Sequence, residues 1–290
     1  MLRWLARIAG GLLLLLVIAV GAIYLQSNRI IYKRHPFQPH AVAVPSDSAS
    51  LAQGERIARI RCYGCHADSL YGQVFFEERF VARLSAANIP AKLLTMTDAE
   101  FAGFLRTGVR KDGTSPFIMP PPGFYHFSDA DLGALIAYLR SMPQGGAPLP
   151  PNTYGPMGRL GVVLGEFKTA VSEFDTTVAR VGDDPAWATS RHGEYIARII
   201  CSECHGPRLT GDPAAAGGDT ATPSLSGAYG YSLEEFVKLL RTGTPRQATT
   251  QLGLMGETAR NSLKYLTDAE IAEVYDYLKT LPLAGVQLTK

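Results

Sequence analysis

The chain has little net charge, few cysteines and no segment that alternates in the manner of a half-buried β-strand. Its 290 residues carry 28 Lys and Arg against 26 Asp and Glu, a formal net charge of +2. Neither half has the basic excess of a nucleic-acid-binding protein, so we expect no nucleic-acid partner. The absence of period-two alternation predicts an all-α fold. The only four cysteines all lie in two short motifs.

Both motifs have the pattern Cys-x-x-Cys-His and lie 139 positions apart: Cys62-Tyr63-Gly64-Cys65-His66 and Cys201-Ser202-Glu203-Cys204-His205. Two thiols on one short turn can add to the two vinyl groups of a haem, and the next residue offers an imidazole to the iron. The pattern therefore predicts two covalently bound haem c groups, with His66 and His205 as the proximal iron ligands.

Three other interpretations of the cysteines are weaker. Zinc knuckles of the Cys-x-x-Cys type normally close over about 15 to 20 residues, whereas these copies are far apart and each has its own histidine. A thioredoxin-like dithiol requires alternating strands and helices, which the chain lacks. Disulfides within each motif would leave the repeated histidine unexplained.

One long apolar run, Ile8 to Leu25, follows Arg3 and Arg7. Its 18 residues would form a helix of roughly 27 Å, enough to cross a bilayer core. The run is longer than the apolar region of a signal peptide, which has about 7 to 15 residues. We therefore expect residues 1–27 to be a transmembrane anchor, with a cleaved signal ending near Gly21 and Ala22 as the alternative.

The rest of the chain is a tandem repeat. The segment from Gly54 to Ile60 corresponds to Gly193 to Ile199, and in each half a helix is expected to lead into the motif. Capping-box patterns begin a later helix at Thr97 and at Ser232. We expect a tether at 28–47, a first domain at 48–143, a linker at 144–184 and a second domain at 185–290. The linker is expected to form a strap across the two domains.

The far side of each iron decides between a carrier and a catalyst, because a closed six-coordinate haem transfers electrons whereas an open position can bind substrate. Met119 and Met255 occupy matched loops after the two motifs, and a thioether there is a suitable axial ligand. A lone Met is more often core filler, but the repetition favours ligation. His126 is the alternative ligand for the first haem.

These residues resemble the class I cytochrome c family over about residues 50 to 143 and 190 to 282. That family crosses a glycine of its first helix against an aromatic residue of its last, which Gly54 with Tyr138, and Gly193 with Tyr277, match. It also places a proline carbonyl on the proximal imidazole, which Pro223 matches, whereas the first half offers alanine in the corresponding segment.

The resemblance implies a membrane-anchored dihaem cytochrome c that carries electrons between redox protein partners, as a subunit of a membrane complex and with no catalytic residues of its own. It also implies the bacterial inner membrane, crossed once, with both haem domains in the periplasm. The alternative is a dihaem enzyme, peroxidase-like or acting on sulfur compounds, with one open haem position. A haem-based sensor is a third possibility, and nothing in the sequence resembles an output domain.

Overall fold

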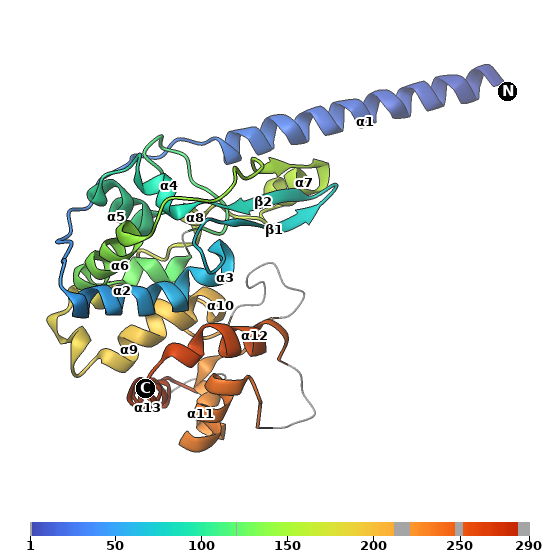
Figure 1. Ribbon diagram of the computed structural model, residues 1–290. Coiled ribbons are helices and arrows are strands. Elements are labelled where there is room, and N and C mark those ends of the chain that lie inside the picture. Colours follow the sequence, from blue (N-terminus) through green and yellow to red (C-terminus); the bar gives the residue numbers. More distant parts are fainter. Residues whose placement is uncertain (1, 120, 212–220, 247–251, 284–290) are drawn as a thin grey trace.

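The computed structural model describes residues 2–119, 121–211, 221–246 and 252–283. It is mostly helical, which confirms the predicted class (Figure 1). The longer helices are α1 (Leu2–Ile31), α2 (Ser48–Arg61), α5 (Asp98–Thr107), α6 (Asp129–Ser141), α7 (Pro156–Leu164), α11 (Leu233–Thr242), α12 (Gly253–Asn261) and α13 (Asp268–Leu278). The short helices are α3 (Tyr63–His66), α4 (Ile89–Leu93), η1 (Pro122–His126), α8 (Ala170–Glu173), η2 (Val181–Asp183), η3 (Pro185–Ala188), α9 (His192–Ile196), η4 (Ala197–Cys201), α10 (Ser202–His205), η6 (Leu225–Gly230) and η7 (Leu263–Tyr265).

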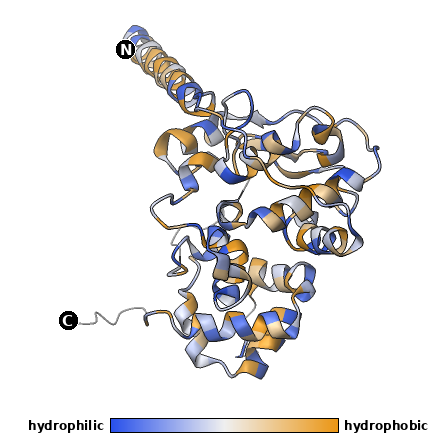
Figure 2. Ribbon diagram, turned by 90° about the vertical axis from the view of Figure 1, so that its left-hand side faces the viewer, coloured by the Kyte–Doolittle hydropathy of each residue, from blue (hydrophilic) through white to orange (hydrophobic). Residues whose placement is uncertain are grey.

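The first helix, α1, projects from the body of the protein (Figure 1), and apolar residues predominate along it (Figure 2). The stretch from Arg3 to Ile31 is long and apolar enough to cross a membrane, and no other described part of the chain buries its most apolar window. Within the described part of the chain, α1 is packed at its carboxyl end, where it contacts α7 and where Ser27 and Ile31 are buried. The Arg159 guanidinium of α7 lies over the ring of Tyr24, 4.5 Å from its centroid.

The helix boundaries follow the capping signals in the sequence. Thr97 and Glu100 form a complete capping box at the start of α5, and Ser232 and Glu235 form another at the start of α11. Each box satisfies two backbone N–H groups that have no partner inside the helix. Both helices end at a glycine with positive φ, Gly108 at 68° and Gly243 at 70°, a conformation that favours glycine.

A small antiparallel sheet lies outside the sequence prediction. Strand β1 (Gln73–Glu78) pairs with β2 (Ala82–Ala86), which also pairs with β3 (Thr153–Tyr154) from the linker. The register of β1 shifts between Val74 and Phe76. Such a bulge destroys the period-two pattern that would reveal a strand.

The segments on either side of the first domain pack along it. The stretch after α1 is fixed by backbone hydrogen bonds from His35 to Gly113 and from His40 to Ala99, both 2.8 Å. In the linker, the apolar run that includes Val162 forms α7 and packs on α1. Later linker residues contact both halves: the N–H of Val171 donates to Oγ of Ser115 at 3.0 Å, and Asp175 lies 3.7 Å from Arg208.

In each half the first helix crosses closely against the last. A Cβ atom at Gly54 would overlap the carbonyl oxygen of Ala134 and come 2.8 Å from the Cβ of Tyr138. A Cβ at Gly193 would overlap the carbonyl oxygen of Glu273. Glycine is thus required at both crossings, as the family resemblance implied.

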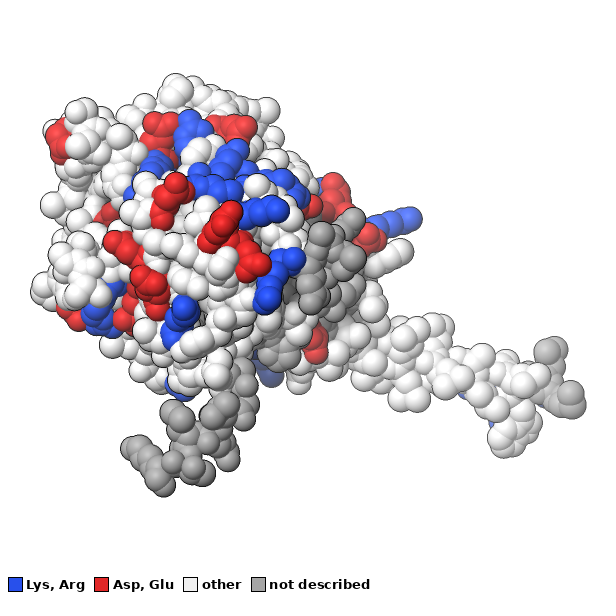
Figure 3. Space-filling view, turned by 90° about the horizontal axis from the view of Figure 1, so that it is seen from below, with Lys and Arg blue, Asp and Glu red and all other residues white. Residues whose placement is uncertain are grey.

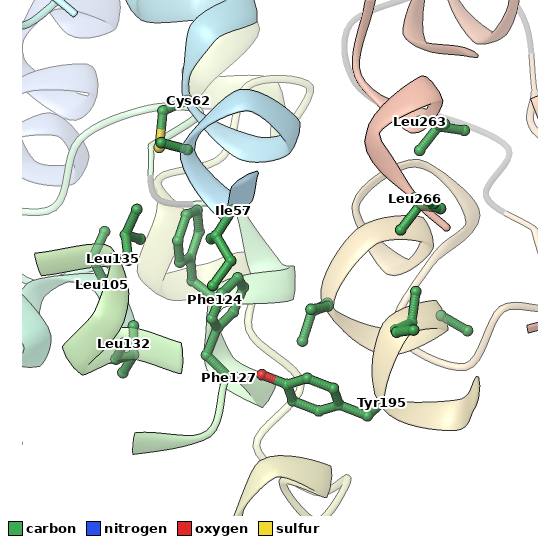
Figure 4. Close-up of a cluster of buried hydrophobic side chains, with 14 of the residues drawn as sticks. Ile57, Cys62, Leu105, Phe124, Phe127, Leu132, Leu135, Tyr195, Leu263 and Leu266 are labelled. Carbon is green, nitrogen blue, oxygen red and sulfur yellow. The ribbon is translucent and has the colours of Figure 1, made fainter. Parts of the chain in front are cut away.

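The two halves share one buried core. Phe124 and Phe127, whose rings stack with centroids 4.9 Å apart, lie next to Tyr195 of the second half (Figure 4). The surface seen from below carries basic and acidic side chains interspersed with each other (Figure 3). The two halves are therefore held together by a continuous apolar contact.

Candidate functional site

The first motif is a single turn of helix that begins where α2 ends. The backbone N–H of Cys62 still donates to Ala58, the last bond of α2, and the N–H of His66 donates to the carbonyl of Cys62 at 2.9 Å. Cys62 is buried and Cys65 is exposed. This turn keeps both thiols within one helical turn of the imidazole, as attachment to one haem requires.

The second motif repeats this arrangement after a different helix. Residues Ala197–Cys201 form η4, a wider π-type turn, and α10 then contains Cys204 and His205. Widened turns of this kind are frequent at functional sites. Cys201 and Cys204 are both partly buried.

No disulfide joins any of the four thiols, and burial suppresses the ionisation of three of them. Desolvation raises the pKa of Cys62 and of Cys201 to about 12, and that of Cys204 to about 11. Among the described residues, no three His, Cys, Asp or Glu side chains converge where they could hold a metal ion. Because no disulfide joins the cysteines, both thiols of each motif are available for thioether links.

Both motif histidines are oriented by a backbone carbonyl. Nδ1 of His66 lies 2.7 Å from the carbonyl oxygen of Ala87, and Nδ1 of His205 lies 2.8 Å from that of Pro223. A carbonyl only accepts, so Nδ1 must donate and Nε2 keeps its lone pair. Burial lowers the pKa of both imidazoles, which favours this neutral form. A neutral ring with its Nε2 free suits an iron ligand.

The carbonyl of Ala87 is a contact that the sequence did not reveal. A proline was expected at this place and the first half has none, yet the same hydrogen bond forms. The bond uses the main chain, so the side chain of the residue that supplies it can change. The acceptor lies 21 residues after the histidine in the first half and 18 in the second, so the two corresponding segments differ in their spacing from the motif.

The two methionines lie in different local structures. Met119 follows Ile118, whose φ is positive at 69°, and both Met119 and Met255 are partly buried against the core. Met255 was expected in a loop but lies in the first turn of α12. Gly256 is the only glycine between Met255 and the end of α12 at Asn261, so the helix can continue through this segment. Met96 and Met142 also pack against the core.

His126, the alternative ligand for the first haem, is buried between the two halves. Its side chain is close to Arg198 and Arg180, and burial together with these positive charges lowers the pKa of His126 to about 4. Its Nδ1 has no hydrogen-bond partner among the residues that the structure describes. His126 therefore forms part of the contact between the two halves.

Arg106 and Arg241 lie at matched helix ends, and each forms an ion pair with the first residue of the last helix in its own half. Arg106 is buried and pairs with Asp129, the first residue of α6. Arg241 lies 2.6 Å from Asp268, the first residue of α13. These ion pairs give both arginines a structural role within their own half.

Comparison with known proteins agrees with this duplication. The family model described as "Cytochrome c" matches residues 51–143 and again 192–282. The chain is 27% identical over 266 residues to the "Fructose dehydrogenase cytochrome subunit" of Gluconobacter japonicus, covering 80% of this chain and 53% of that protein.

Two further relatives have similar names. One is the "Alcohol dehydrogenase (quinone), cytochrome c subunit" of Gluconacetobacter polyoxogenes, 27% identical over 274 residues, which cover 82% of this chain and 57% of that protein. The other is the "Gluconate 2-dehydrogenase cytochrome c subunit" of Pantoea cypripedii, 27% identical over 277 residues, 81% of this chain and 60% of that protein. The chain thus spans little more than half the length of these curated relatives.

Proposed function

We propose that this chain, which belongs to the cytochrome c family, is a dihaem electron-transfer subunit of a membrane-bound dehydrogenase. The two matched segments each contain one Cys-x-x-Cys-His motif, which implies two haem c groups. The observation that carries the proposal is the same hydrogen bond in both halves, from Nδ1 of the motif histidine to a backbone carbonyl. It leaves two equivalent imidazole nitrogens for iron.

The residues divide into three roles. Cys62 and Cys65 form the thioether links of the first haem, and Cys201 and Cys204 form those of the second. His66 and His205 are the proximal ligands, oriented by the carbonyls of Ala87 and Pro223. Met119 and Met255 would supply the other iron ligand of each haem, which is supported by their matched order in the chain and their packing against the core.

A bound haem supplies a one-electron Fe(III)/Fe(II) couple at each site. The chain's own part is to fix the two imidazoles, to keep them neutral and to exclude water around them. His66 and His205 are only 5% and 8% exposed. An apolar setting and thioether ligation both stabilise the reduced state relative to an exposed site.

The partner in this proposal is a dehydrogenase subunit that passes electrons to the cytochrome. The relatives' names are its support, since all three are cytochrome subunits of dehydrogenases. The periplasmic side of the bacterial inner membrane is the proposed location, with α1 as a retained single-pass anchor. The length of α1 supports retention, because the stretch from Arg3 to Ile31 is long and apolar enough to cross a membrane.

The proposed domains are an anchor at 1–27, a tether at 28–47, cytochrome domains at 48–143 and 185–290, and a linker at 144–184. Support comes from the repeated order of a motif helix, a capped helix and a last helix in each half. The last residues of the second domain lie outside the described residues.

Purification of the tagged chain from native membranes in mild detergent tests the assignment. We expect the chain to stay with the membrane pellet after carbonate washing and to copurify with a larger redox subunit. Recovery of the mature chain in the soluble periplasmic fraction would refute the anchor. Recovery of the membrane-bound chain alone, with no redox protein attached, would refute the subunit assignment.

A further inference from the structure

The contact between the two halves is pseudo-symmetric. Arg56 of α2 places its Nη1 atom 2.7 Å from Oε1 of Glu270 in α13. In the opposite direction, the hydroxyl of Tyr195 in α9 donates to Asp131 of α6 at 2.6 Å. Tyr195 is the counterpart of Arg56, and Glu270 the counterpart of Asp131, at the 139-residue offset. The same two positions therefore contact each other twice, once in each direction between the halves. This is the pattern of the isologous interface of a two-fold dimer.

A second pair of contacts follows the same rule. The guanidinium of Arg59 lies over the ring of Tyr265, 5.5 Å from its centroid. Arg198, the counterpart of Arg59, lies close enough to His126, the counterpart of Tyr265, to lower the pKa of that imidazole. The halves are therefore related by an approximate two-fold axis.

One ion pair near this axis breaks the symmetry. Nη2 of Arg61 lies 2.8 Å from Oε2 of Glu203, and their side chains are 6% and 34% exposed. The counterparts of these residues at the 139-residue offset are Ile200 and Gly64, which carry no charge. Each charge therefore occurs in one half only, so the pair has no symmetric copy.

The Arg61–Glu203 pair joins the two attachment motifs. Arg61 is the residue before Cys62, and Glu203 lies between Cys201 and Cys204. In Figure 1 the short helices α3 and α10, which carry the two motif histidines, lie next to each other. The charges are thus built into the chain at the two haem-binding turns.

The surroundings of Arg61 fix its position and strengthen its field. Its guanidinium lies over the ring of Phe124, 5.4 Å from the centroid. A Cβ at Gly123 would come 3.3 Å from its Nη2 atom and would overlap the carbonyl oxygen of Ile199. A charge with so little contact with water is poorly screened, so it acts strongly on nearby groups.

We propose that Arg61 and Glu203 are positioning residues that hold the two haem-attachment turns together. Arg61 raises the reduction potentials of the haem sites, and Glu203 lowers them. This inference rests on the proposed function, because it concerns two redox groups bound at these turns. A nearby positive charge stabilises the reduced state, which carries one more electron, and a nearby negative charge stabilises the oxidised state. The pair also makes the environments of two otherwise similar sites unequal.

The test compares Arg61→Gln, Glu203→Gln and the double variant in the full-length, haem-loaded chain, by redox titration followed in the visible spectrum. We expect Arg61→Gln to lower the mean potential, Glu203→Gln to raise it, and the double variant to return close to the wild type. Arg56→Gln is the matched control, since it removes an ion pair from the same interface away from the motifs. We expect it to leave the potentials unchanged.

Loss of one partner leaves the other charge buried and can reduce assembly. The charge-swapped variant Arg61→Glu with Glu203→Arg keeps a pair and covers that case. It should bind two haems and change the separation between the two potentials. Single variants that shift the mean potential in the same direction, or a swap that changes neither potential, would overturn the proposal. A wild-type chain with fewer than two haems would instead refute the proposed function.

Discussion

At the scale of the residue, the sites depend on few atoms, and the distal ligands are the most direct to examine. Replacing Met119 or Met255 by Ala should leave the haem attached, because the thioether links and the proximal histidine remain. The potential of the altered site should fall, since thioether ligation raises it, and the reduced site should bind carbon monoxide. Met96→Ala, which also removes a partly buried Met, should do neither.

Visible spectra and a redox titration of the same samples measure these effects. An unchanged potential in Met119→Ala, without carbon monoxide binding, would assign the sixth position to another residue, and His126 would be the next to replace.

The cysteines and histidines of the motifs could be predicted from the sequence. The backbone carbonyls that accept hydrogen bonds from the histidines could not all be predicted. Cys62, Cys201 and the motif histidines follow from spacing alone. The bond from His66 to Ala87 does not, because it uses a main-chain oxygen that any residue can supply. Side-chain patterns therefore locate the haem sites, and only the fold locates the carbonyls that orient the imidazoles.

At the scale of the element, the crossing of α2 on α6 limits what the first domain tolerates. Gly54→Ala places a methyl group against the carbonyl of Ala134, and the helices must separate to admit it. We expect a loss of about 2 kcal/mol in the free energy of unfolding, as for an overpacked core. Gly227→Ala is the control, because a Cβ there meets nothing within 4 Å. Equal denaturation midpoints for the two variants would contradict the close crossing.

Most helices could be predicted and the small sheet could not. Capping boxes at Thr97 and Ser232 mark helix starts through contacts three residues apart, so local sequence contains the signal. The pairing of β2 with β3 joins residues that are far apart in the sequence, such as Arg83 and Thr153. The bulge in β1 interrupts the period-two pattern of its side chains. Met255 was misplaced for a related reason, because glycines near it suggested a loop where the helix α12 forms.

At the scale of the whole molecule, the contact between the halves should weaken in acid. Burial alone would raise the pKa of Glu270, but hydrogen bonds from the Thr267 backbone and the Arg56 side chain outweigh it, and the net pKa lies below the ordinary 4.5. A carboxyl with a lowered folded-state pKa stabilises the fold above its unfolded pKa, and this contribution is lost as pH falls through the folded value. We therefore expect the interface to loosen below pH 4.5.

Proteolysis of the linker at decreasing pH, in the wild type and in Glu270→Gln, measures this loosening. The variant should be more easily cleaved at neutral pH and should change less as pH falls. Asp98→Asn, which removes an ion pair with Arg140 inside the first half, should keep the wild-type profile. Identical profiles for the wild type and Glu270→Gln would show that this carboxylate does not hold the halves together.

The central claim is that the chain holds two covalently attached haems, one on each Cys-x-x-Cys-His turn. A pyridine haemochrome assay on purified chain of known concentration, with an acid-acetone extraction of the same sample, tests it most directly. We predict two haems per polypeptide, both retained by the protein after extraction. One haem per polypeptide, or haem that passes into the acetone, would contradict the account.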